Sequence, residues 1–329
     1  MRLRTPLTVV ALAGSLVIAP AAAGAVPCAV TDTMIKASQA WVTRGTDPQA
    51  NNWSNAGFHV GNLAQVRTTG ISNHKTWPWV QANRFLLPLD PADPFAPDAQ
   101  ATGEAYLDVA YFHPEPEVLQ PLRDTLRAQV ADGRTDHWRS PDALNMALPS
   151  FTRVAVADHD QAVLDYSYRS YRDLRRRAFD ELTGLWSLNV QTNGWAVQGL
   201  AKAVLALPAD DPYRADYATT LRRTAQTLRF LQRHDGFWGA TGRDSAATAM
   251  ITYAFAAGIN AGVLDRDTYL PAVRRGWQAL LTALDADGML GWVAARNSWR
   301  PASAGDSAGF AVGSFLIAGQ QVVRLTPGC

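Results

Sequence analysis

The chain has 329 residues, 47% of them hydrophobic, which is enough apolar material for a large core. Thirty Lys and Arg residues against 29 Asp and Glu residues leave a formal net charge of +1, so the basic surplus typical of nucleic-acid-binding proteins is absent. No Gly/Ser linker or block of charge divides the chain. We therefore predict one large domain over residues 26–329.

The N-terminus has the pattern of a secretory signal peptide. Arg2 and Arg4 precede an apolar stretch over residues 7–19, and the small residues 23–25 follow it. A membrane anchor is the alternative, but the apolar run is short for a span. We expect residues 1–25 to be cleaved, the mature protein to have no membrane span, and its location to be secreted or periplasmic.

Two cysteines, Cys28 and Cys329, lie near the opposite ends of the chain. In an oxidising compartment such a pair usually forms a disulfide. A bond between them would tie the two ends together, which suits a fold whose last element packs beside its first. We predict this disulfide, with two free thiols as the alternative.

Helical periodicity dominates the chain, and two kinds of helix alternate. Amphipathic helices, which expose one face to water, are predicted over residues 118–130, 216–233 and 269–284. Helices that are apolar or small nearly all round, and so buried on every side, are predicted over residues 195–207, 246–262 and 310–323.

The spacing of glycines indicates a repeat. Glycines predicted to end amphipathic helices lie 51, 52 and 52 residues apart: Gly133, Gly184, Gly236 and Gly288. A tryptophan follows each of them: Trp138, Trp186, Trp238 and Trp292. The buried helices are predicted to start near polar residues: Ser54, Asp98, Asp142, Asn193, Asp244 and Asp306. Six starts predict an all-α (α/α)6 barrel of six helix pairs. An open solenoid is the alternative, but it needs polar capping repeats, and neither end resembles one.

This architecture places the N-termini of all six inner helices at one mouth of the barrel. The loops that carry the tryptophans end there too, which predicts a concave, aromatic-lined pocket with carboxylates, typical of a carbohydrate site. Several of the eleven tryptophans are expected to be core residues instead.

Two aspartates are the candidate catalytic residues. Asp142 follows Ser140, a natural N-cap, and Pro141, which suits the first helical position. Its carboxylate is therefore not needed for capping. Asp98 starts the preceding inner helix, where it could also serve as a cap. Adjacent inner helices place the two carboxylates at the same depth, as an acid/base pair requires.

Several motifs resemble the unsaturated glucuronyl and rhamnogalacturonyl hydrolases of glycoside hydrolase families 88 and 105. The Asp-Ala-Leu-x-Met-Ala-x-Pro stretch that begins at Asp142 is similar to the signature of that group. Pro97-Asp98, with Gly103 and Tyr106, is similar to its other acidic motif. Further similar segments are Asn193-Gly194-Trp195 and residues 234–238, 245–253 and 269–324. The likeness covers roughly residues 35–325.

The resemblance implies an enzyme that hydrates the 4,5 double bond of the unsaturated uronic acid that a polysaccharide lyase leaves at a chain end. The hemiketal formed then opens and the sugar is released. The residue matching Asp142 would protonate the alkene carbon and then activate water, and the residue matching Asp98 would assist it and hold the sugar. We expect an oligosaccharide substrate and no metal, cofactor or nucleic-acid partner. The predicted substrate-binding residues are His137, Trp138, Trp186, Asn193, Trp195, Trp238, Arg243, Asp244 and Trp292.

The sequence departs from the group near the expected uronate site. Thr192 stands where Arg usually precedes Asn-Gly-Trp, and the segment between residues 184 and 193 is short. Asp244 stands where Glu is common. The candidates to replace the missing cation are Arg139, Arg243 and Arg296. Two alternatives stay open: an inverting glycosidase whose two carboxylates lie about 6.5–9.5 Å apart around a water, and a non-catalytic glycan-binding barrel.

Overall fold

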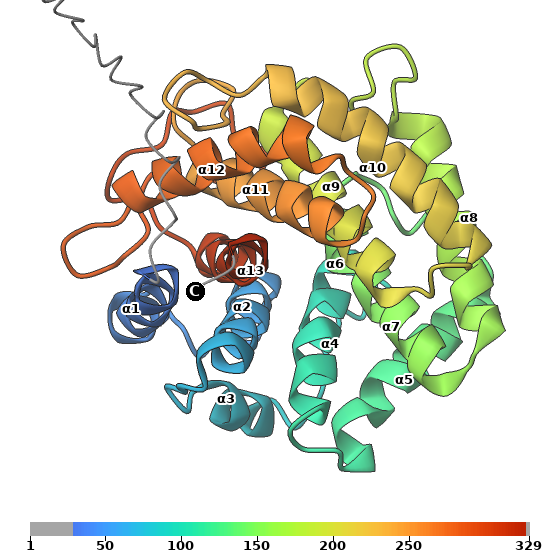
Figure 1. Cartoon of the computed structure of the whole chain (residues 1–329). Coiled ribbons are helices and arrows are strands. Elements are labelled where there is room, and N and C mark those ends of the chain that lie inside the picture. Colours follow the sequence, from blue (N-terminus) through green and yellow to red (C-terminus); the bar gives the residue numbers. More distant parts are fainter. Residues whose placement is uncertain (1–28, 327–329) are drawn as a thin grey trace, which may run out of the picture.

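The computed structural model describes residues 29–326, and these form two concentric rings of helices (Figure 1). The inner ring consists of α2 (Trp53–Thr69), α4 (Pro97–Ala110), the pair α6 (Ala143–Met146) and α7 (Leu148–Asp158), α9 (Val190–Ala206), α11 (Ser245–Asn260) and α13 (Gly309–Leu325). The outer elements are α1 (Ala29–Arg44), α3 (Thr76–Ala82), α5 (Pro116–Asp132), α8 (Gln161–Ala178), α10 (Pro212–Phe230) and α12 (Arg266–Thr282).

The inner ring is closed. Each inner helix contacts the next along the chain, and α13 returns to pack along α2. The closing contact is tight, because a Cβ atom added to Gly313 would lie 1.9 Å from the carbonyl oxygen of Gly57. The predicted (α/α)6 barrel is therefore confirmed, and the open solenoid is excluded.

The outer ring closes beside the same seam. Arg44 on α1 donates to both carboxylate oxygens of Asp285, at 3.0 and 2.9 Å, just after α12. Helix α1 also packs on α13, so the last helix lies beside the first, as predicted. The signal peptide, Cys28 and Cys329 lie outside the described residues, so cleavage and the disulfide stay predictions. No helix within residues 29–326 is long and apolar enough to cross a membrane.

The glycine prediction holds for one helix and is wrong for three. Gly133 is the C-cap of α5, with a positive φ of 76° and its N–H bonded to Gln129. Helices α8, α10 and α12 end several residues before the positive-φ glycines Gly184, Gly236 and Gly288. These three glycines lie in tight turns that follow the helices. Both a helix C-cap and a tight turn use the left-handed conformation that glycine favours, so the sequence alone does not tell which of the two a glycine forms.

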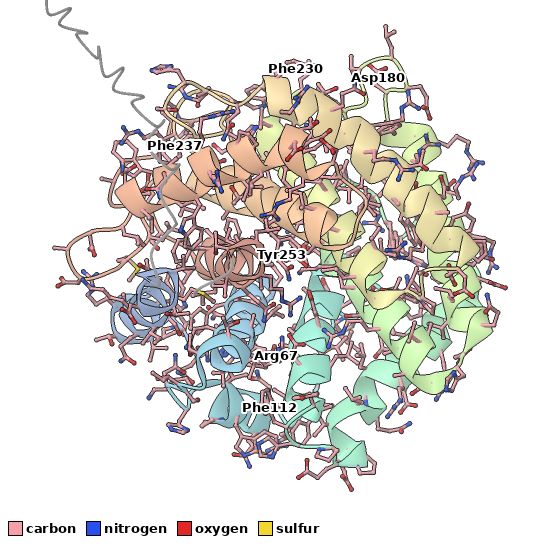
Figure 2. The ribbon with its side chains drawn as sticks, in the orientation of Figure 1. Arg67, Phe112, Asp180, Phe230, Phe237 and Tyr253 are labelled. Atoms are coloured by element: carbon pink, nitrogen blue, oxygen red, sulfur yellow. The ribbon has the colours of Figure 1, made fainter. Side chains whose placement is uncertain are left out.

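The two ends of the barrel differ. The N-terminal ends of the inner helices form the mouth, which the loop between α12 and α13 partly covers. Toward the opposite end, all the long inner helices contribute residues to the lining of a cavity of about 620 Å³, among them Arg67 on α2 and Tyr253 on α11 (Figure 2).

Candidate active site

The two predicted acids lie at the mouth and neither caps its helix. Asp98 is in the first turn of α4, and Asp142 immediately precedes α6; no side-chain hydrogen bond caps either helix. Both carboxylates are therefore available for other contacts. The Asp142 side chain is 3% exposed, whereas that of Asp98 is 41% exposed. One acid is thus buried and its partner faces solvent.

Arg296 joins the two acids. It lies in the loop between α12 and α13, and its Nε donates to Oδ2 of Asp142 at 2.7 Å while Nη2 bonds the same oxygen. Its Nη1 donates to Oδ2 of Asp98 at 2.7 Å. Ser140 donates its hydroxyl to the other oxygen of Asp142. Because both carboxylates contact one guanidinium group, they lie close enough to face a single sugar ring.

An aromatic floor supports this guanidinium. The Cζ atom of Arg296 lies 4.8 Å from the ring centroid of Trp53 at the start of α2, a cation–π contact. Trp53 packs against Trp195, with ring centroids 6.0 Å apart, and against Phe310 at 5.1 Å. A cavity of about 20 Å³ lies beneath these rings and is also lined by Gln198. That volume suffices for one water molecule.

The start of α9 holds the loop that carries Arg296. Gln191 accepts the N–H of Asn297 at 2.6 Å, and the Thr192 hydroxyl donates to Oδ1 of Asn297 at 2.9 Å. The amide of Asn189 donates to the carbonyl of Ser298 at 3.2 Å. Thr192, which stands where the resemblance expects an arginine, therefore fixes the segment that brings an arginine from elsewhere.

Asp244 has a structural role, and its predicted sugar contact is not supported. It caps α11 through the N–H groups of Ala246 and Ala247, at 2.9 and 3.2 Å. Gln191 donates to its second oxygen at 3.1 Å. Burial raises the pKa of Asp244 to about 7, although these hydrogen bonds oppose the shift. Its oxygens are thus occupied by the protein.

Asn193 is likewise occupied. Its side-chain oxygen accepts the N–H of Trp186 at 2.7 Å, and its amide donates to the carbonyls of Ser187 and Asn189. The residue is 1% exposed. The prediction that Asn193 binds substrate is therefore corrected: it shapes the turn before α9.

Four of the predicted sugar-contacting tryptophans are core residues. Trp138 and Trp238 are 0% exposed, Trp195 is 1% and Trp186 is 4% exposed. The Trp238 indole N–H donates to the carbonyl of Leu228 at 2.7 Å, inside the layer between the two rings. A stacked sugar needs an open ring face, which these side chains lack. The direction in which a side chain points depends on tertiary packing, which a sequence pattern does not give.

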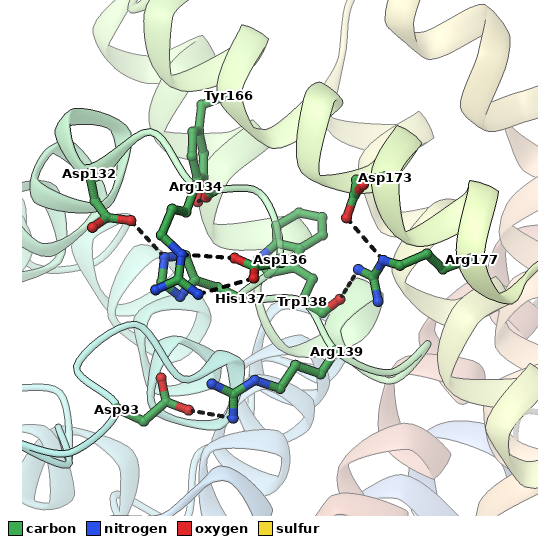
Figure 3. A network of polar contacts seen from close by, with 10 residues as sticks. All are labelled: Asp93, Asp132, Arg134, Asp136, His137, Trp138, Arg139, Tyr166, Asp173 and Arg177. Carbon is green, nitrogen blue, oxygen red and sulfur yellow. Dashed lines mark hydrogen bonds and ion pairs between the residues drawn. The ribbon is translucent and has the colours of Figure 1, made fainter.

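The loop of residues 132–139 is fastened by polar contacts (Figure 3). His137 is buried, and its Nε2 lies 2.9 Å from a carboxylate oxygen of Asp132, so this nitrogen is engaged. The carbonyl of Trp138 accepts from Arg177 at 2.8 Å. Arg139 pairs with Asp93 at 3.3 Å. His137 therefore serves the loop, and the prediction that it contacts substrate is not supported.

Arg243 and Trp292 form a separate, partly exposed pair. The Arg243 guanidinium lies 5.3 Å from the ring centroid of Trp292 and 5.2 Å from that of Phe237, with Asp235 at 3.8 Å. Their predicted substrate contact stays a prediction. Of the three arginines considered as replacement cations, Arg296 is the one that contacts the acids.

Sequence reasoning missed two aromatic residues here, Trp53 under Arg296 and Trp299 on the same loop. Trp299 is 57% exposed three residues after Arg296, which suits a sugar platform. Neither follows one of the repeat glycines. An aromatic residue at the first position of an inner helix, as at Trp53, is the available sequence signal.

Comparisons with known proteins agree with this barrel. Residues 190–326 match the model of Glycosyl Hydrolase Family 88. An unsaturated 3S-rhamnoglycuronyl hydrolase of Formosa agariphila is 29% identical over 226 residues, covering 59% of this chain and 60% of the relative. An enzyme of the same description from Alteromonas sp. is 21% identical, covering 85% and 79%. The chain therefore spans about 60% of the length of the first relative.

A solved structure has the same fold as this chain. A glycosyl hydrolase family 88 protein from Bacteroides vulgatus superposes with a TM-score of 0.84 at 23% identity, covering 90% of this chain and 98% of that one. The family model covers the C-terminal inner helices and the Arg296 loop, and the structural likeness extends to the N-terminal half, which carries Asp98 and Asp142. These comparisons support the predicted resemblance to the unsaturated glucuronyl hydrolases of glycoside hydrolase family 88.

Proposed function

We propose that this protein hydrates the 4,5 double bond of a terminal unsaturated uronic acid on lyase-generated oligosaccharides and so releases that sugar. The observation that carries the proposal is the cluster of Asp98, Asp142 and Arg296 over Trp53. It combines two acids with a cation suited to a carboxylate, and the exposed Trp299 on the Arg296 loop offers an aromatic surface suited to a sugar ring. The two sequence relatives described above are named as unsaturated 3S-rhamnoglycuronyl hydrolases.

Asp142 is the proton donor in this proposal. It is the buried acid, and its Oδ1 is held by the Ser140 hydroxyl, which orients the carboxyl group. Protonated, it delivers a proton to the alkene carbon; as the resulting carboxylate, it takes a proton from the attacking water. Addition of water gives a hemiketal, whose opening expels the remaining oligosaccharide.

Asp98 assists from the solvent side. Its carboxylate lies on the opposite end of the same guanidinium and is 41% exposed. It accepts hydrogen bonds from the sugar hydroxyls. The division into a buried acid and a solvated carboxylate gives the two residues different tasks.

The test is the loss of ultraviolet absorbance of the unsaturated uronyl group in lyase digests of pectin, glycosaminoglycan, ulvan and gellan. We expect decay with at least one digest, and a fall of about 10³-fold in kcat for Asp142→Asn, the middle of the usual range for a general acid. Thermal unfolding of the variant checks that the fold is intact.

Two results would contradict the proposal. An Asp142→Asn variant with full activity would remove Asp142 from the chemistry. A flat trace with every digest would favour the alternatives, which differ in readout. Product from a saturated glycoside indicates an inverting glycosidase, whereas binding without product indicates a glycan-binding barrel.

Export is a further part of the proposal. Residues 1–25 carry the charged start, the apolar stretch and the small-residue cleavage pattern of a signal peptide. We expect the protein recovered outside the cytoplasm of a secreting host to begin at Val26, by intact mass. The same spectrum, with and without alkylation, tests the Cys28–Cys329 bond: two alkylated thiols in the native protein would rule it out.

A further inference from the structure

We propose that Arg296 takes up the carboxylate of the terminal sugar together with a proton, so that substrate binding itself puts Asp142 into its acid form. This inference rests on the proposed function. It assigns Arg296 as the residue that selects a negatively charged sugar and links its arrival to the protonation of Asp142.

The hydrogen bonds of Arg296 leave room for another acceptor. A guanidinium group has five N–H donors. Three contacts join Arg296 to carboxylates among the described residues: two to Asp142 and one to Asp98. Two N–H groups therefore stay available at a side chain that is 25% exposed. Guanidinium N–H groups match a carboxylate acceptor in charge and in planarity.

The net charge of the cluster gives the reason why binding of a uronate would be accompanied by uptake of a proton. One guanidinium and two ionised carboxylates sum to −1, so a bound uronate would bring the total to −2 in a partly buried site. Like charges at contact distance disfavour full ionisation. Uptake of one proton restores the original charge.

Burial decides which acid receives the proton. Asp142 is 3% exposed and Asp98 is 41% exposed, so water stabilises the ionised form of Asp98 far better. Arg296 now stabilises ionised Asp142 through two donors on one oxygen. When the uronate takes up part of this donor capacity, that oxygen is free to bind a proton from solvent. It is the proton that the reaction next delivers to the alkene.

The surrounding ionisable groups have partners of their own, and burial raises the pKa of Asp244 to about 7, so that Asp244 is mostly protonated at about pH 6. Asp244 on α11 is engaged with the backbone and Gln191, and Glu104 on α4 pairs with Lys202 on α9 at 2.7 Å deeper in the barrel. Arg139, next to Ser140, pairs with Asp93. The neighbours contributed by α2, by the start of α9 and by α13 are neutral: Trp53, Asn189, Gln191, Thr192 and Phe310.

The loop that holds Arg296 makes such an exchange possible. Arg296 reaches the acids from outside the barrel helices, on a segment whose backbone is held by Gln191 and Asn189 and whose Asn297 side chain is held by Thr192. These bonds hold the loop in place without involving the guanidinium. The side chain can therefore change partners while the loop and the helices keep their positions.

The experiment compares binding of an unreactive, saturated disaccharide that ends in glucuronate with its carboxyl-reduced counterpart. Calorimetry at about pH 6, below the raised pKa of Asp244, in two buffers that differ in ionisation enthalpy, measures both affinity and proton uptake. For the wild type we expect uptake of about one proton with the uronate and none with the alcohol.

Variants separate charge recognition from structure. We expect Arg296→Gln to lose about 100-fold in affinity for the uronate and to lose proton uptake, with little change for the alcohol. Arg296→Lys should regain part of the affinity. Arg300→Gln, an exposed arginine on the same loop, is the matched control and should behave as the wild type.

The inference fails if wild-type binding of the uronate takes up no proton, or if folded Arg296→Gln keeps the preference for uronate over alcohol. Failure of the proposed function looks different. In that case no digest loses its absorbance, although the uronate still binds with a proton. Conversely, absorbance decay that persists in Arg296→Gln with an unchanged KM would keep the reaction and remove the role of Arg296.

Discussion

Both ends of the barrel contain arginine–aspartate clusters, but their composition is reversed. At the mouth one arginine, Arg296, contacts two carboxylates. At the opposite end one carboxylate, Asp108, accepts from Arg67 at 3.1 Å and from Arg153 at 2.8 Å. Helix N-termini favour negative charge and C-termini favour positive charge, so the surplus at each end follows the helix dipoles.

The sources of the side chains differ as well. Arg67, Asp108 and Arg153 all belong to inner helices, so their ion pairs join α2, α4 and α7 directly. Arg296 comes from a loop, so the link that it makes between Asp98 on α4 and Asp142 before α6 depends on a side chain outside the helices. Arginine–aspartate ion pairs therefore stabilise the fold at the end with Asp108, whereas at the mouth the arginine can exchange its partners. This contrast predicts which substitutions change stability and which change activity.

The largest expected effect on stability is pH-dependent and arises at the mouth. The pKa of Asp244 is about 7 in the folded protein, against about 3.9 when unfolded. Between these values the folded state holds a proton that the unfolded chain has released. The free energy of unfolding contributed by Asp244 therefore falls as pH rises from about 4 to 7, by about 4 kcal/mol at 1.36 kcal/mol per unit.

Asp244→Asn keeps the capping oxygen and removes the titration. Urea unfolding at several pH values should show a smaller loss of stability between about pH 4 and 7 in the variant than in the wild type. The matched control is Asp265→Asn at the exposed cap of α12, where hydrogen bonds from Thr268 lower the pKa of the aspartate. Equal pH slopes in the wild type and in Asp244→Asn would contradict the assignment.

The second prediction concerns the opposite end. Burial alone would raise the pKa of Asp108, but the guanidinium groups of Arg153 and Arg67 outweigh it and hold the pKa below its ordinary value. Asp108→Asn leaves two partly buried cations without their carboxylate, which should cost about 3 kcal/mol of unfolding free energy. Turnover of an unsaturated uronyl substrate, measured below the unfolding transition, should be unchanged.

The contribution of Asp108 to the free energy of unfolding changes with pH in the direction opposite to that of Asp244. A lowered folded-state pKa gives stability that is present above the unfolded value and is lost as pH falls through the folded one. Asp108→Asn should therefore lack part of the acid-induced loss seen in the wild type. A large fall in kcat at unchanged stability would show that the far end takes part in function.

Sequence patterns predicted the barrel because periodicity and repeat spacing are local signals. The predicted inner-helix starts near Ser54, Asp98 and Asp244 lie within one residue of α2, α4 and α11. The last start, near Asp306, is three residues early, because residues 293–308 form a loop before Gly309. Helices that are apolar nearly all round can be assigned to the inner ring from sequence alone, because both faces must be buried.

The site was predicted only in part, for physical reasons. Asp98 and Asp142 were identified from helix-start chemistry, which is local. Arg296 lies 154 residues after Asp142 in a segment without periodicity, so only the folded loop shows that it, rather than Arg139 or Arg243, contacts the acids. The buried tryptophans illustrate the same limit, since the direction of a side chain is set by tertiary packing.

The smallest predicted effect concerns the hydroxyl that holds the Arg296 loop. Thr192→Val keeps the shape of the side chain and removes the donor to Asn297, a bond of 2.9 Å at a residue that is 7% exposed. The loss of one such hydrogen bond costs about 1 kcal/mol. We expect a fall of about fivefold in kcat/KM for an unsaturated uronyl substrate, with a small change in the unfolding midpoint.

The matched control is Thr252→Val on α11, where the buried hydroxyl has no hydrogen-bond partner among the described residues. That substitution removes an unpaired polar group, so activity should stay at the wild-type level and stability should not fall. If Thr192→Val behaves like Thr252→Val in kcat/KM, the α9 contact does not position Arg296, and the backbone bonds from Gln191 and Asn189 hold the loop by themselves. If only Thr192→Val loses activity, the threonine that replaces the expected arginine supports the loop that delivers Arg296 to the two acids.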